Sequence, residues 1–373
     1  MNVGFSPEQE AFRAEVRAFL EPWADLDGFF GQGHKWERVA QLFREMGERG
    51  WLALSWPKEH GGLGRGPAWE YILWDEVAYA RAARNPLSSG IVARSLVRCG
   101  SEEQKRRWLP PIRTGEIHFS LAYSEPEAGS DLASLRVRAE RDGEVYVVNG
   151  QKCWQSYAQD MDYFWLLART GEPDSRSAGL SLFICDKNAR GVEVRGLPTL
   201  DGDQLNEVFF EHVSVPASQR VGPENGAWSI MGEALADERH IQFPPGRVRR
   251  DLEEMVAWIE GAGLAGDPVV RRTLADLAVE VAEVEMHALL VLDAMQKGRP
   301  AVAEAAANKI VHTLVCQRIA RAVVEFGGPA ALVTGSRPEL LWRQSMWETI
   351  GGGTSEIMRG VVAKNALKLG ARS

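Results

Sequence analysis

The stretch Leu121–Asp131 (LAYSEPEAGSD) stands where the pattern of the chain changes. Before it, from Ser6 to about Arg113, apolar residues recur every three or four positions, which is typical of helices. After it, as far as about Val221, the apolar period is two and turn residues recur at regular intervals, which predicts antiparallel strands. The Pro, Gly and hydroxyl residues of the stretch predict a loop at which a helical domain gives way to a β-domain.

The chain after the stretch divides into a strand-rich and a second helical region. The expected strands are Arg136–Glu140, Val145–Val148, Tyr163–Ala168, Leu180–Cys185, Val192–Arg195 and Val208–Val215. Asn149-Gly150 is interpreted as a tight hairpin turn and Gly171–Ser177 as an exposed hairpin loop. The helical period returns after Pro223 and is clearest from Leu274 to Val291.

Three Pro- or Gly-rich segments interrupt the helical patterns. Trp56–Gly62 is expected to form a loop between helices, and Pro244-Pro245-Gly246 must break or kink a helix. Gly351-Gly352-Gly353 is expected to form a turn before the last helix. The sequence therefore predicts an α+β protein with a helical domain over residues 1–117, an antiparallel β-domain over 118–222 and a helical bundle over 223–373.

Composition excludes several classes of function. A formal charge of −8 argues against a nucleic-acid-binding face, which needs clustered Lys and Arg. The sequence contains no run of about 18 apolar residues that would indicate a membrane span, and its first ten residues lack a signal-peptide pattern. A cytoplasmic protein is therefore expected. Four widely separated cysteines, Cys99, Cys153, Cys185 and Cys316, indicate reduced thiols rather than a metal site.

The stretch Leu121–Asp131 resembles the signature at the start of the β-domain of acyl-CoA dehydrogenases, whose α, β, α order also matches this chain. The resemblance implies bound FAD, approached closely by the backbone of this loop. The residues implied at the cofactor are Leu121, Tyr123, Ser124, Gly129 and Ser130, and Ser130 is also implied at the substrate. The alternative, a turn that merely enters a sheet, does not account for so long a match.

Two further segments resemble motifs of the same family. In Asn149–Ser156 (NGQKCWQS), Trp154 matches the Trp that covers one flavin edge, and Ser156 matches the hydroxyl that meets flavin N5. Trp154 by itself would be interpreted as a core aromatic residue, but its place after the first motif favours the flavin. In Ile350–Arg359 (IGGGTSEIMR), Thr354 and Glu356 match the residues that reach the FAD.

The position of the catalytic glutamate of many relatives is here Gly352, which the resemblance places at the substrate. A second branch of the family, with the isovaleryl and long-chain types, carries the base on an earlier helix in a Glu-Arg pair. Glu238 and Arg239 match that pair, so Glu238 is the candidate base and Arg239 a candidate substrate contact. The alternative is a solvated helical glutamate, with Asp237 the neighbour most easily confused with it.

The resemblance implies α,β-desaturation of an acyl-CoA thioester. The base removes the α-proton, hydride passes from the β-carbon to flavin N5, and an electron-transferring flavoprotein reoxidises the flavin. Hydrogen-bond donors, one of them a backbone N–H near Gly352, stabilise the developing charge on the thioester oxygen. The alternatives are an acyl-CoA oxidase, a dehydrogenase of carrier-protein thioesters, and a non-catalytic subunit of a mixed tetramer, against which Glu238 argues.

The chain departs from the family where one subunit reaches the FAD of another. The region Trp258–Pro268 lacks the Arg-x-x-Phe-Gly run of most relatives, and Val324 replaces a Gln before Gly327-Gly328. Either a homotetramer holds FAD differently, or a paralogous chain supplies the contacts in a mixed tetramer. The segment Trp56–Gly62 resembles a loop of bacterial relatives that degrade steroid side chains, which favours a bulky or cyclic acyl-CoA.

Overall fold

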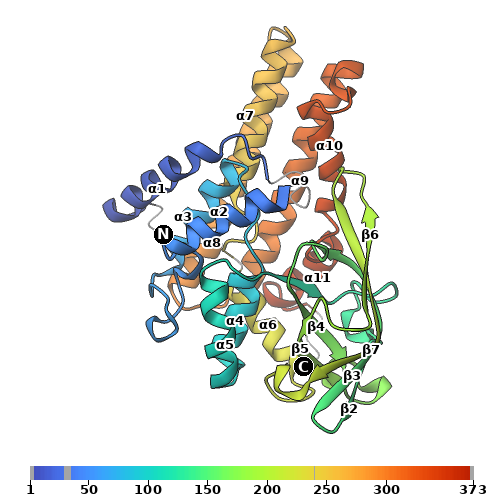
Figure 1. Cartoon of the computed structure of the whole chain (residues 1–373). Coiled ribbons are helices and arrows are strands. Elements are labelled where there is room, and N and C mark those ends of the chain that lie inside the picture. Colours follow the sequence, from blue (N-terminus) through green and yellow to red (C-terminus); the bar gives the residue numbers. More distant parts are fainter. Residues whose placement is uncertain (1–3, 29–34, 239, 370–373) are drawn as a thin grey trace. The chain divides into compact units, whose positions relative to one another are not determined.

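The computed structural model describes residues 4–28, 35–238 and 240–369. Contacts within the chain define two compact units (Figure 1). We call residues 1–30, 66–84 and 239–373 the helical unit, and residues 31–65 and 85–238 the sheet unit. None of the helices in the described ranges is both long and apolar enough to cross a membrane.

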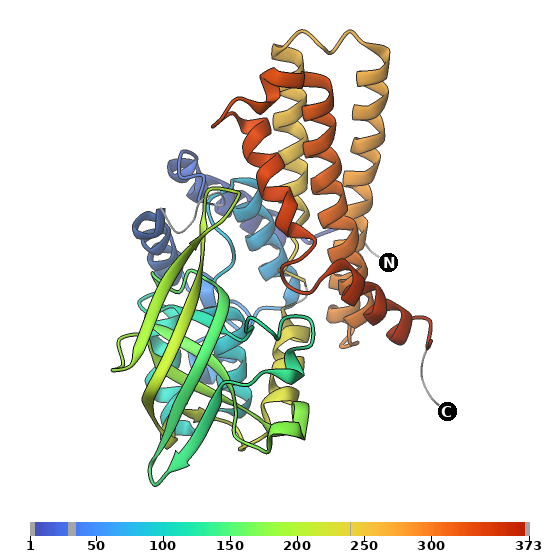
Figure 2. The same ribbon diagram turned by 90° about the vertical axis from the view of Figure 1, so that its right-hand side faces the viewer.

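The helical unit contains a bundle of long helices. Its helices are α1 (Pro7–Leu20), α3 (Pro67–Tyr79), α7 (Pro245–Gly261), α8 (Pro268–Gln296), α9 (Val302–Gly327), α10 (Arg337–Glu348) and α11 (Ser355–Asn365). Figure 2 shows α7, α8, α9 and α10 running alongside one another. Their facing sides form a continuous apolar core that includes Val248, Met255, Val284 and Ile319.

Local sequence explains where these helices begin and which side they bury. Ser6 caps α1 and forms a reciprocal capping box with Gln9, and the Asp267 side chain accepts the first backbone N–H groups of α8. On α8 the residues spaced by three and four, among them Leu277, Val281, Val284 and Val291, are buried as the sequence pattern predicts.

The sheet unit combines one eight-stranded sheet with short helices. The helices are α2 (Trp36–Glu48), α4 (Ala93–Cys99), α5 (Glu102–Arg113) and α6 (Ala227–Asp237). The strands are β1 (Phe119–Ala122), β2 (Arg138–Asp142), β3 (Val145–Ser156), β4 (Tyr163–Arg169), β5 (Leu180–Asp186), β6 (Val192–Pro198), β7 (Gln204–Pro216) and β8 (Arg220–Val221). They are ordered β6-β7-β3-β2-β4-β5-β8, with β1 beside β4.

Strand β4 lies at the centre of the sheet unit and is buried on both faces. Trp165 and Leu167 pack with residues of α4, α5 and α6, whereas Phe164, Leu166 and Ala168 pack with side chains of the other strands. A strand covered on both faces is a continuous apolar run, as Tyr163–Ala168 is. Helical regions before and after a mostly antiparallel sheet confirm the predicted α+β class.

Several expected turns and breaks are confirmed. Gly171–Ser177 belongs to the connection between the antiparallel strands β4 and β5, which contains a 3₁₀ turn over Pro173–Gly179. The helical pattern is broken between Asp237, where α6 ends, and Pro245, the first residue of α7, with Pro244 as the cap residue. The three glycines 351–353 form the turn before α11.

The prediction for Asn149-Gly150 is wrong, because these residues lie inside β3. The register between β3 and β7 shifts between Val148 and Gly150, so the pair forms a bulge rather than a hairpin turn. The β2–β3 turn lies earlier, at Gly143, whose φ is 58°. The sequence pattern also missed β1 and β8, which are too short to show a period of two, and β1 pairs with β4 in parallel.

Buried His118 gives the sheet unit a predicted pH dependence. Burial lowers the pKa of its imidazole to about 4, from about 6.5 in an unfolded chain. Between these values the unfolded state binds a proton that the folded state rejects. We expect the free energy of unfolding to fall by up to about 3 kcal/mol as the pH drops from about 6.5 to 4. Urea unfolding at a series of pH values measures this loss.

The variant His118→Gln tests the assignment, since its amide replaces the imidazole Nε2, which lies 3.1 Å from the Gly115 carbonyl. It should flatten the slope over that pH range, whereas His212→Gln, at an exposed site, should leave the slope unchanged. Equal slopes for the wild type and His118→Gln would contradict the prediction.

Candidate active site

A buried ion pair joins the first two motifs of the sheet unit. The Lys152 ammonium group donates to the Glu125 carboxylate at 2.9 Å and to the Tyr123 carbonyl at 2.8 Å. Glu125 also accepts the backbone N–H groups of Arg136 and Val137. Burial lowers the pKa of Lys152 to about 8, although Glu125 opposes this change.

Backbone contacts extend this junction along β3. The Cys153 N–H and the Gln155 side-chain amide both donate to the Ser124 carbonyl, each at 3.0 Å. The Ser120 hydroxyl donates to the Ser156 carbonyl at 2.8 Å. The structure therefore places Leu121, Tyr123 and Ser124 alongside the segment that carries Trp154 and Ser156.

Trp154 has an unusual conformation for a residue within a strand. Its φ is 63°, in the left-handed region, and it lies in a bulge where the register with β7 shifts between Lys152 and Gln155. Its side chain is 49% exposed, so it is not the core aromatic residue of the alternative interpretation. A bulky residue held at positive φ by surrounding contacts is typical of a functional site.

After Ser124 the first motif forms a turn in which Glu125 and Ala128 are buried and the other residues are exposed. An isolated bridge between Glu125 and Ala128 closes it, and Gly129 and Ser130 follow on the surface. A Cβ atom added to Gly129 would meet nothing within 4 Å. The backbone at Gly129 is therefore open to a ligand.

Glu238 belongs to the sheet unit and is buried, with 1% of its surface exposed. The sequence places it on a helix, but α6 ends at Asp237 and Glu238 is the residue that caps its C-terminus. Its carboxylate lies against Gly90 in the π-helical segment Ser88–Val92. Its charge also acts on the Tyr123 hydroxyl: burial raises the pKa of Tyr123, Trp165 opposes the rise, and Glu238 adds to it.

The third motif lies in the helical unit. The Thr354 hydroxyl caps α11 by accepting the N–H of Ile357 at 3.2 Å, and Glu356 is exposed in the first turn. Hydrogen bonds from its own backbone N–H and from Thr354 hold the pKa of Glu356 below its ordinary value. Gly352 and Gly353 have φ values of 67° and 95°, which favour glycine.

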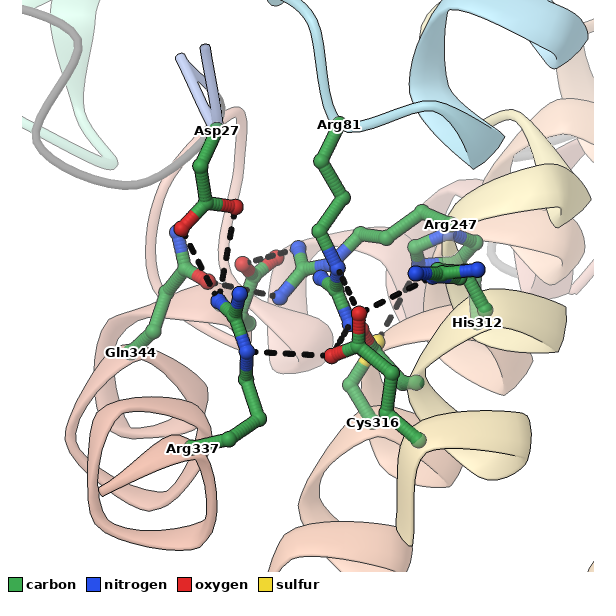
Figure 3. A network of polar contacts seen from close by, with 11 residues as sticks. Asp27, Arg81, Arg247, His312, Cys316, Arg337 and Gln344 are labelled. Carbon is green, nitrogen blue, oxygen red and sulfur yellow. Dashed lines mark hydrogen bonds and ion pairs between the residues drawn. The ribbon is translucent and has the colours of Figure 1, made fainter. Parts of the chain in front are cut away.

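A buried polar network holds the end of α10, directly before this turn (Figure 3). Arg247 of α7 pairs with Glu348, the last residue of α10, and donates to the Gln344 side chain at 3.2 Å. Burial alone would raise the pKa of Glu348, but Arg247 outweighs it and lowers the value. Arg81 and Asp251 extend the network through an ion pair of 2.7 Å.

The two units divide the predicted site residues. Leu121, Tyr123, Ser124, Gly129, Ser130, Trp154, Ser156 and Glu238 belong to the sheet unit, and Gly352, Thr354 and Glu356 belong to the helical unit. Arg239 lies outside the described residues.

Sequence reasoning missed the residues that support the site, above all Lys152, Glu125, Gly90, Arg247 and Glu348. Lys152 lies within β3 and Glu125 in the loop after β1, so two opposite charges inside the two motifs were the available signal. Nothing in the sequence marks Gly90 or the pairing of Arg247 with Glu348, because each depends on a contact between distant segments.

Known proteins resemble this chain over almost its whole length. Residues 6–116, 120–213 and 225–367 match, respectively, the N-terminal, middle and C-terminal domains of acyl-CoA dehydrogenases. The acyl-CoA dehydrogenase FadE26 of Mycobacterium tuberculosis is 35% identical over 401 residues, covering 99% of both chains.

Two solved structures resemble the whole chain. The Tcur3481-Tcur3483 steroid ACAD has a TM-score of 0.92 at 33% identity. The ChsE4-ChsE5 complex from Mycobacterium tuberculosis has a TM-score of 0.89, also at 33% identity. Each comparison covers 100% of both chains. The chain thus belongs to the acyl-CoA dehydrogenase family, a family of flavoproteins, and is an oxidoreductase that acts on CH–CH groups.

The Lys152–Glu125 pair leads to a prediction about stability. Lys152→Met leaves the Glu125 charge buried without its partner, so the free energy of unfolding should fall by about 3–5 kcal/mol. The double variant Glu125→Gln/Lys152→Met should recover part of this loss, because no buried charge remains. Urea unfolding of the three proteins at neutral pH gives the comparison.

A matched control is Lys297→Met, which removes a lysine whose side chain is 56% exposed and paired with Asp293. It should change stability little. If Lys152→Met lowers the free energy of unfolding no more than this control does, the predicted contribution of the buried pair is contradicted.

Proposed function

We propose that this enzyme uses FAD to desaturate an acyl-CoA thioester between its α and β carbons, with Glu238 as the base. The observation that carries the proposal is a carboxylate with 1% exposure in the same compact unit as the two flavin motifs. A carboxylate removed from water is a stronger base than a solvated one. The empty second base position, Gly352, is consistent with this assignment.

The described residues fit a bound flavin. Trp154 presents an exposed indole beside Ser156, and Gly129 leaves backbone open to close approach. Thr354 and Glu356 stand at the N-terminus of α11, where backbone N–H groups favour hydrogen-bond acceptors. Bound FAD supplies the acceptor for the hydride that leaves the β-carbon.

The protein's own part in the reaction is to orient the thioester and remove a proton. In this proposal the Glu238 carboxylate takes the α-proton, and backbone N–H groups near Gly352 stabilise charge on the thioester oxygen. Arg239 is proposed as a substrate contact, and an electron-transferring flavoprotein as the partner that reoxidises the enzyme.

Glu238→Gln tests the base directly. The amide keeps the size of the side chain but cannot take the proton, so turnover should fall by at least about 10³-fold while the FAD content stays normal. Bleaching of the flavin absorbance by a panel of straight-chain, branched and steroid acyl-CoA esters measures the first half-reaction.

The matched control is Glu233→Gln, on an exposed part of α6 where Glu233 pairs with Arg98 at 3.2 Å. It should bleach at the wild-type rate. Wild-type bleaching by Glu238→Gln itself would place the base elsewhere, while a loss in both variants would indicate damage to α6.

A steroid or similarly bulky acyl-CoA is the proposed substrate class. Its support is the resemblance to the steroid ACAD and the loop Trp56–Gly62, in which the Trp56 indole donates to the Ser89 carbonyl at 3.1 Å. That bond attaches the loop to the π-helical segment against which Glu238 lies. The loop therefore belongs to the surroundings of the base.

We further propose that a paralogous chain completes the enzyme. The structures of similar proteins named Tcur3481-Tcur3483 and ChsE4-ChsE5 are of paired subunits. Where relatives carry polar groups that reach the FAD of a neighbouring subunit, this chain has apolar packing. A Cβ atom added to Gly327 would lie 2.3 Å from the Trp258 ring, and Val324, like Trp258, packs against the helical core.

Because few polar groups lie at that position, the chain should bind FAD weakly when it is expressed alone. We expect less than one FAD per chain, and co-expression with the paralogue should raise both flavin content and activity, since a ligand stabilises the assembly that binds it better. Flavin absorbance after denaturation, together with mass by light scattering, measures both. One FAD per chain in an active homotetramer would refute the mixed assembly, and it would leave the assignment of Glu238 as the base unchanged.

A further inference from the structure

The Glu238 carboxylate occupies the space that a side chain at residue 90 would need. A Cβ atom built on Gly90 would lie 1.3 Å from Glu238 Oε1, 2.5 Å from its Cδ and 3.3 Å from its Cγ. Ordinary van der Waals contact begins at 3.4 Å, so any side chain here would displace the carboxyl oxygen by about 2 Å.

The segment that carries Gly90 cannot easily yield. All five residues of the π-helical segment Ser88–Val92 are buried. The Ser88 hydroxyl accepts the N–H of Phe119 at 2.8 Å, and the Ser89 carbonyl accepts the Trp56 indole N–H at 3.1 Å. Bonds from β1 and from the loop Trp56–Gly62 thus hold the two residues that precede Gly90, and π-helical turns of this kind are frequent at functional sites.

Backbone conformation does not explain the glycine. Gly90 is not among the glycines with positive φ, so an alanine could adopt the same backbone without strain. Within a helical segment glycine is less favourable than alanine, because it loses more conformational freedom on folding. The three atoms nearest to a built Cβ all belong to Glu238, so we take the space that this side chain needs as the reason for glycine.

On the side of strand β1, Tyr123 is the residue that interacts with the Glu238 carboxylate. Its hydroxyl is buried, and the Glu238 charge acts on it. Tyr123 follows β1, the strand whose first residue, Phe119, is bonded to Ser88. The π-helical segment, β1 and the end of α6 therefore form one connected support around Glu238.

We propose that Gly90 is a positioning residue, whose missing side chain sets the place of the Glu238 carboxylate. Its catalytic consequence rests on the proposed function, whereas the packing relation between the two residues does not.

Gly90→Ala tests the proposal in the FAD-loaded enzyme. The methyl group should push the carboxylate away from its place, so kcat should fall about 100-fold with little change in KM, because substrate binding does not require the base. Exchange of the substrate α-proton with deuterium, followed by NMR, should slow by a similar factor. The control Gly232→Ala on α6, where a Cβ would meet nothing within 4 Å, should keep wild-type kcat.

A double-mutant cycle separates positioning from a general packing role. Gly90→Ala should lower the melting temperature of the wild type, but in a Glu238→Ala background it should leave it unchanged or raise it. The same loss in both backgrounds, or wild-type kcat for Gly90→Ala, would overturn the proposal. Full activity of Glu238→Gln would overturn the assignment of the base, and the cycle would still decide whether Gly90 makes room for Glu238.

Discussion

The sheet unit depends on a charge held where water does not reach, the ammonium group of Lys152. Its partners are the Glu125 carboxylate and the Tyr123 carbonyl, and Glu125 also binds the backbone N–H groups that lead into β2. Removing two charges from water is costly, and only a complete set of partners offsets that cost. The requirement fixes the loop after β1 against β3, and with it the positions of Trp154 and Ser156.

The helical unit meets a similar constraint with different residues. Arg247 is buried at 3% side-chain exposure, and its pairing with Glu348 joins α7 to the last residue of α10 (Figure 3). The glycine turn begins three residues after Glu348, at Gly351, so this ion pair holds the helix end from which the turn departs. In both units the residues that resemble family motifs are supported by buried charges whose loss would leave a partner unsatisfied.

In each unit, some of the predicted site residues and their neighbours leave space unfilled or surface exposed. Trp154 keeps a strained backbone and an exposed ring, Gly352 and Gly353 have a conformation that favours glycine, and Gly90 leaves room for a carboxylate. Such positions do not improve packing of the protein itself, since each exposes surface or omits a side chain. Their cost is offset by the rigid neighbours described above, a pattern expected where a protein must hold reactive groups in one place.

The sequence by itself determined the order of helical and strand regions, because periods of three to four and of two are local properties of the chain. It also determined the three motifs and both candidate base positions, since these are contiguous runs of residues. Only the tertiary structure decided that Asn149-Gly150 is a bulge and that β1 pairs in parallel with β4, because a strand's partner lies elsewhere in the chain. Likewise, only folding brings Gly90 against Glu238 and Arg247 against Glu348, since side-chain contacts between residues about one hundred or more positions apart leave no mark in a local pattern.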